Sequence, residues 1–207
     1  MLSTHMEFGF IIAFFLIKLT EWITPSASSE SILPLSTILV LLGFFGGLLP
    51  DIDNLENIGF SHRKTLHFPI GYGLLTVLLV GLAYFISDFS VYIMGFACIF
   101  AGAWLHSVMD ILDGFYEVPE HGVYEHITRK WISALNLIPF ASLWEWSLQS
   151  IGAVTFIAIS PFLPEIFTLP GWIVAVVLYL IVWLLSTLWE FRKKVPKRLE
   201  MQKRFNV

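Results

Sequence analysis

The chain has 207 residues, of which 57% are hydrophobic and 14% charged, and its mean hydropathy is +0.76. Because an ordinary soluble domain has about a quarter of its residues charged, this composition excludes a typical soluble enzyme and predicts a multi-pass membrane protein. The net charge of -4 carries little information, and the single cysteine, Cys98, excludes an intrachain disulfide.

Apolar runs follow one another along the chain, each about the length that crosses the hydrocarbon core of a bilayer. We therefore expect an all-α fold, an integral membrane bundle of about six transmembrane helices. The expected spans are 8–23, 32–49, 68–86, 89–112, 144–163 and 170–189. The fifth run is the least regular, because Glu145, Gln149 and Pro161 interrupt it, and a shorter, tilted or re-entrant helix is an alternative there.

Lysine and arginine are distributed asymmetrically over this topology. Loops 50–67 and 113–143 and the tail 192–207 hold nearly all of them, whereas the opposite loops hold none. The positive-inside rule then predicts that both termini are cytoplasmic and that the protein lies in the cell (inner) membrane. The expected organisation is a transmembrane domain over 1–191, followed by a basic juxtamembrane tail over 192–207. A cleaved signal peptide is the alternative for the first run, but no basic residue precedes it.

Three separated segments bring histidine and aspartate to this same side of the membrane. These residues are His5 before the first run, Asp51, Asp53, His62 and His67 after the second, and His106, Asp110 and Asp113 at the end of the fourth. Asp110 and Asp113 follow His106 by four and seven residues, which places all three on one helical face. Ionisable groups are costly in an apolar setting and normally have partners. Their convergence predicts a cytoplasm-facing metal site.

Each segment also has a simpler interpretation when it is taken alone. An Asp-x-Asp sequence after a helix is commonly a cap or a turn. His62 and His67 could lie in a solvated basic loop, and His106 with Asp110 could form one buried pair. The convergence of all three segments is what favours a joint site.

The candidate ligands are nitrogen and oxygen atoms, with no thiolate. Such a set suits Zn, Mn, Fe or Mg and does not select among them. More than four candidate ligands indicate two divalent ions, the arrangement that clamps both oxygens of a phosphoester during hydrolysis. Arg63 is the expected phosphate-binding residue, and Asp113 or Glu117 the expected general acid. The segment 117–126 is expected to form a polar interfacial helix that aligns Glu117, His121 and Glu125.

Four motifs in order resemble the YdjM-type family of predicted membrane-bound metal-dependent hydrolases over about residues 4–126. The motifs are Thr4-His5, Leu49-Pro50-Asp51-Ile52-Asp53, His62-Arg63 with His67, and His106-Ser107-x-x-Asp110. The resemblance implies an integral membrane hydrolase that binds metal through these histidines and aspartates. The family is also similar, more loosely, to the zinc-dependent phospholipase C and P1 nuclease group, which implies phosphoester chemistry and favours zinc.

The chain departs from the family pattern in the second loop. Where the family tends to read His-Arg-Gly-x-Thr-His-Ser, this chain reads His62-Arg63-Lys64-Thr65-Leu66-His67-Phe68. The small and hydroxyl residues beside the second histidine are replaced, so the hydrogen bonding around His67 is expected to differ.

The expected function is metal-dependent hydrolysis of a phosphoester on a lipid or other amphiphile, with membrane lipids as partners and no nucleic acid. A metal or proton transporter is one alternative, and it predicts ionisable residues deep in several runs, where the sequence places almost only Lys18. A non-catalytic scaffold stabilised by metal is another, and it predicts a closed coordination sphere.

Overall fold

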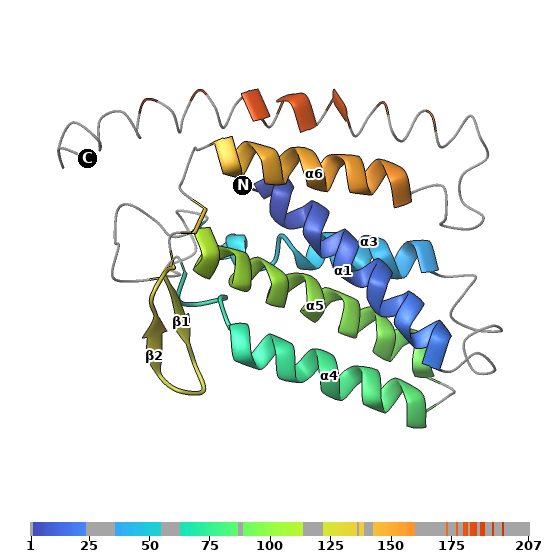
Figure 1. Ribbon diagram of the computed structural model, residues 1–207. Helices are drawn as coiled ribbons and strands as arrows, with labels where there is room; N and C mark the ends of the chain where they lie inside the picture. The colour runs from blue at the N-terminus through green and yellow to red at the C-terminus, as the bar shows by residue number, and fades with distance from the viewer. Residues whose placement is uncertain are drawn as a thin grey trace.

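The computed structural model is mostly helical, as the apolar runs predict (Figure 1). The structure describes residues 2–23, 36–54, 63–86, 89–113, 122–135, 137–138, 143–159 and isolated positions between 173 and 196. The helices are α1 (Leu2–Ile23), α3 (Ser36–Gly46), the 3-10 helix η2 (Pro50–Asn54), α4 (Pro69–Phe85), α5 (Ser90–Asp113) and α6 (Leu143–Ile159). Strands β1 (Val123–Glu125) and β2 (Lys130–Ile132) form a hairpin.

Helix α5 is central to the bundle and packs against α1, α3 and α4, while α6 packs against α1 (Figure 1). The apolar core includes Phe10 and Ile17 from α1, Val40 from α3, and Met94 and Cys98 from α5. These side chains recur at helical spacing, so each helix buries one apolar stripe against its neighbours.

Glycines let three of these helices approach very closely. A Cβ atom added to Gly102 of α5 would clash with the carbonyl oxygen of Gly43 in α3, and one added to Gly9 of α1 would clash with the same carbonyl. Small residues permit such backbone contact. Gly9 lies one turn after His5, and Gly102 lies one turn before His106, so this contact brings the two histidine-bearing helix ends together.

The structure does not show six transmembrane helices. Helices occupy parts of five expected runs, and the sixth run falls largely outside the described residues. Within the described part of the chain, one helix, Ser90–Leu112, is long and apolar enough to cross a membrane by length and composition, and Pro69–Phe85 is apolar but shorter. Insertion in the membrane and the six-span topology therefore remain predictions.

The hairpin is a correction to the all-α prediction. The expected helix over 117–126 is wrong at Val123–Glu125, which pairs antiparallel with Lys130–Ile132. Val, Tyr, Trp and Ile favour extended backbone, and here Tyr124 pairs with Trp131 and Val123 with Ile132. Arg129 closes the turn with a positive φ of 54°. Residues 117–121, including Glu117, lie outside the described residues.

Candidate metal centre

A buried polar cluster lies at one end of the bundle, where α1 and α4 begin and α5 ends (Figure 1). Its members come from four segments that are distant in the sequence. They are His5 of α1, Asp51 and Asp53 of η2, Arg63 and His67 before α4, and His106 and Asp110 of α5. All have less than a tenth of their surface exposed except Asp51, whose side chain is 21% exposed.

His5, His106 and Asp110 form a first group of possible ligands. His5 Nδ1 lies 3.2 Å from His106 Nε2, and His5 Nε2 lies 3.8 Å from Asp110 Oδ1. His106 Nε2 lies 3.5 Å from Asp110 Oδ2. One ligand atom from each residue falls within 4.8 Å of the others, which is close enough for all three to bind the same ion.

Asp51, His67 and His106 form a second group with the same property. His106 Nε2 lies 3.7 Å from Asp51 Oδ1. Asp110 links the two groups, because its Oδ2 accepts a hydrogen bond of 2.9 Å from His67 Nε2. These buried histidines and aspartates could therefore hold a metal ion.

His106 and His67 are both oriented through their Nδ1 atoms. His106 Nδ1 donates to the carbonyl oxygen of Gly47 over 2.6 Å, and because a carbonyl only accepts, this nitrogen carries the proton. His67 Nδ1 donates to Asp53 Oδ2 over 3.1 Å. Each ring is thereby turned so that Nε2 points toward the carboxylates of the cluster. Metal-binding histidines are typically held in this way by an oxygen acceptor behind them.

Asp53, which the sequence predicted as a metal ligand, therefore lies behind His67 and orients its ring. Its Oδ2 also accepts the backbone N–H of Leu66 over 3.2 Å. It belongs to neither ligand group. Sequence spacing alone cannot separate a carboxylate that binds a metal from one that orients a ligand.

Arg63 supplies a permanent, buried positive charge to the cluster. Its Nη2 donates to Asp110 Oδ1 over 3.2 Å, and its backbone is in the left-handed region with φ of 58°. A non-glycine residue pays a conformational cost there and persists only when its surroundings hold it. The hairpin does so: Tyr124 N–H donates to the Arg63 carbonyl over 3.0 Å, and His126 Nε2 donates to the Lys64 carbonyl over 2.6 Å.

Glu125, which the sequence analysis placed in an expected polar interfacial helix, has a structural role. It is fully buried, and its Oε2 accepts the N–H of Ile70 over 2.7 Å in the first turn of α4. Its Oε1 accepts the N–H of Ile127 in the hairpin turn. A carboxylate at a helix N-terminus satisfies an otherwise unpaired N–H group and interacts favourably with the helix dipole.

The electrostatics of the cluster favour a protonated His67. Burial acts to lower the pKa of His67, but the carboxylates of Asp110 and Asp53 accept both of its N–H groups and outweigh this effect, raising the pKa to about 9. Without a metal, His67 is therefore a cation at neutral pH. It must lose the proton on Nε2 before that atom can bind a metal.

Three predicted site residues cannot be placed in the cluster. His62 and Glu117 lie outside the described residues, and Asp113 is the last residue of α5, with no described side-chain position.

Sequence reasoning missed a second set of buried polar side chains, between α1 and α6. Glu7 is fully buried and packs against Gly152, and Glu145 and Gln149 are 3% and 2% exposed. Gln149 Nε2 donates to Thr187 Oγ1 over 2.6 Å. The four-residue spacing of Glu145 and Gln149 was the available signal, because it puts both on one face of an otherwise apolar helix.

A scan against protein-family models and searches of curated proteins and of solved structures found no match to this chain.

Proposed function

We propose that this protein is a membrane-bound, metal-dependent hydrolase of the YdjM type that cleaves a phosphoester of a lipid or another amphiphile. The observation that carries the proposal is the orientation of His67 and His106. Both present Nε2 to a buried group of carboxylates, and an arginine lies beside the same carboxylates.

Five described residues would hold the metal: His5, Asp51, His67, His106 and Asp110. His62 is the further ligand that the sequence predicts. Two adjacent ligand groups that share His106 support two ions. The imidazole and carboxylate donors suit zinc, and we favour it because of the resemblance to the zinc-dependent phospholipase C and P1 nuclease group. A divalent ion bound here would act as a Lewis acid that lowers the pKa of water, so that hydroxide would be available as the nucleophile at neutral pH.

Arg63 would bind the phosphate of the substrate. Its guanidinium is buried and held at 3.2 Å from Asp110, so its charge is placed before substrate arrives. A planar guanidinium can donate two parallel hydrogen bonds to phosphate oxygens. In a site with little water, such a donor stabilises the charge that develops on the phosphate in the transition state.

The leaving oxygen needs a proton, and Asp113 or Glu117 would supply it. Asp113 follows Asp110 by three residues on α5, which places its Cα one turn further along the helix. Either carboxyl would have to be protonated when substrate binds.

The surface of the bundle supports a lipid environment. Many large apolar side chains point outward, with Val77 73%, Phe85 81% and Phe96 58% exposed, while fully buried positions hold Glu7, His67 and others. So many large apolar side chains on the outside are unusual for a soluble domain and fit a surface that faces lipid. We therefore propose six spans, with both termini cytoplasmic and the cluster opening to the cytoplasmic leaflet of the cell membrane.

A metal or proton transporter is the second candidate, and buried Glu7 and Glu145 favour it. Both carboxylates are buried and belong to neither described ligand group, although Glu7 precedes the first expected span and Glu145 lies at the start of the fifth. A transporter would move zinc or protons across sealed vesicles without hydrolysing any ester.

The proposal is tested by phosphate or headgroup release from a panel of lipid phosphoesters in mixed micelles with zinc. We expect activity in the wild type and a loss of about 100-fold or more in Arg63→Lys, because lysine cannot make the paired hydrogen bonds. Metal binding should persist in this variant. Glu21→Gln is the control, because Glu21 pairs with Lys18, far along α1 from the cluster. Zinc flux into vesicles with no release from any lipid would contradict the proposal and favour the transporter.

A further inference from the structure

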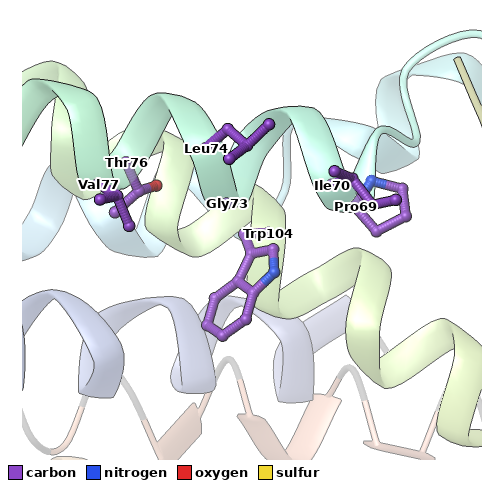
Figure 2. Close-up of a pocket in the computed structure, with 7 residues that line it drawn as sticks. All are labelled: Pro69, Ile70, Gly73, Leu74, Thr76, Val77 and Trp104. Atoms are coloured by element: carbon purple, nitrogen blue, oxygen red, sulfur yellow. The ribbon is translucent and has the colours of Figure 1, made fainter. Parts of the chain in front are cut away.

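An apolar groove of about 340 Å³ lies between α4 and α5 (Figure 2). Its lining residues are Pro69, Ile70, Gly73, Leu74, Thr76, Val77 and Trp104. One end of the groove begins at Pro69, two residues after His67 of the candidate metal centre. The other end lies about two turns further along α4, at Val77.

Gly73 creates the space for this groove. It faces Trp104 of α5, and a Cβ atom added to it would lie 3.1 Å from the indole Nε1 (Figure 2). Any larger side chain would fill the space between α4 and the indole ring. The groove is open to the outside of the bundle, because Leu74 and Val77 are 59% and 73% exposed.

The chemistry of the lining selects an apolar occupant. Thr76 carries the one side-chain hydroxyl of the lining, and it donates to the Tyr72 carbonyl over 2.8 Å, so it is already paired within its own helix. The path from Ile70 to Val77 measures roughly 10 Å along the helix. A narrow, extended hydrocarbon chain suits such a path.

Charge distinguishes the two ends of the site. The Pro69 end adjoins the segment that carries the buried guanidinium of Arg63 and leads from His67 of the candidate metal centre, and the Val77 end is surrounded by apolar surface. This arrangement complements one kind of molecule, an amphiphile with an anionic head and an apolar tail.

We propose that this groove binds one acyl chain of the substrate, so that the phosphate of the same molecule reaches the metal centre. The inference rests on the proposed hydrolase function and specifies its substrate as a long-chain phosphoester. The groove then sets a preference for chain length, since a longer chain buries more apolar surface up to the end of the groove.

The test compares Gly73→Leu with Gly81→Leu. Both replace a glycine on α4 by the same residue and raise helix propensity, but nothing lies within 4 Å of a Cβ added to Gly81. Phosphoesters with a water-soluble short chain and with a long acyl chain serve as substrates. We expect Gly73→Leu to lower kcat/KM at least tenfold on the long-chain ester and to leave the short-chain ester and the metal content unchanged. Gly81→Leu should match the wild type on both esters.

A binding measurement keeps this inference separable from hydrolysis itself. A detergent with a brominated acyl chain should quench tryptophan fluorescence less in Trp104→Phe and in Gly73→Ala than in the wild type, even if no ester is cleaved. Equal quenching in all three proteins, or equal loss of both esters in Gly73→Leu, would overturn the inference. A change of oligomeric state in Gly73→Leu and not in Gly81→Leu would also overturn it, because the groove would then hold a second protein chain.

Discussion

His67 is the residue whose protonation is set most clearly by its neighbours. Two carboxylates, Asp53 and Asp110, receive its two ring N–H groups in a fully buried position. The same contacts that stabilise the imidazolium also aim Nε2 at the cluster. A metal ion bound here would therefore compete with a proton for one nitrogen atom.

This competition predicts how the stability of metal-free protein depends on pH. An ordinary histidine has a pKa of about 6.5, whereas the folded protein raises the pKa of His67 to about 9. A raised pKa stabilises the folded state fully below pH 6.5, and that stabilisation is lost as pH rises through 9. With a chelator present, the Tm should fall between pH 6.5 and 9.5.

The His67→Gln variant provides the control for this titration, because it removes the group that titrates. Its Tm should change less over the same pH interval. A Tm of the chelated wild type that rises toward pH 9, or a fall of the same size in His67→Gln, would contradict the assignment.

Asp53 offers a separate prediction, because it orients a ligand. Asp53→Asn keeps an oxygen that accepts from His67 Nδ1 but removes the negative charge. Loss of such a partner typically weakens metal affinity by about 10-fold to 100-fold. Asp110→Asn, which changes a member of a ligand group, should weaken it further. Zinc affinity measured by competition with a chelating dye ranks the two variants, and the reverse ranking would mean that Asp53 binds the metal itself.

At the level of elements, the cluster depends on the contact between α1, α3 and α5. Gly9, Gly43 and Gly102 bring three backbones together one turn from His5 and His106. The glycines therefore fix the positions of the ligands, although none of them contacts a metal.

Gly102→Ala tests this dependence. The added Cβ would meet the backbone of Gly43 and Gly47, so the helices must separate, at a cost of about 1–3 kcal/mol or more. The Tm should drop and bound zinc should be lost. Gly81→Ala on α4 is the matched control and should be neutral or slightly stabilising. If both variants kept the wild-type Tm and zinc content, the glycine contact would not be what positions the site.

The elements also show what could be predicted from the sequence. Apolar runs are long and continuous, so the existence of α1, α4 and α5 followed from composition alone. The hairpin did not, because a three-residue strand such as Val123–Glu125 leaves too short a pattern of alternating side chains to recognise. The close glycine contact was also missed, since a sequence does not reveal which helices adjoin.

Part of the candidate site could be predicted from the distribution of charged residues along the whole chain. Charge asymmetry assigned the histidine-bearing segments to one side of a membrane, and the structure brings His5, His67 and His106 to one end of the bundle. The roles within the cluster required coordinates. Asp51 and Asp53 are two residues apart in the sequence, yet one belongs to a ligand group and the other supports His67.

For the molecule as a whole, the fold joins a polar, buried end to an outward-facing apolar surface. Most of the site lies inside, with Asp51 its most exposed carboxylate. The groove on α4 begins at the same end of the bundle. Under the proposed function, this arrangement would let the protein draw a lipid from the side and act on its headgroup at the membrane boundary.

The central claim is that His5, His106 and Asp110 come together to hold a divalent metal. The metal content of protein purified in detergent, measured by elemental mass spectrometry after exposure to zinc and extensive dialysis, tests it most directly. The account predicts one or two zinc ions per chain in the wild type and in Glu21→Gln, and less than a tenth of that in a folded His106→Ala variant. Wild-type protein that holds no zinc or other divalent ion, or a His106→Ala variant that holds as much as the wild type, would contradict it.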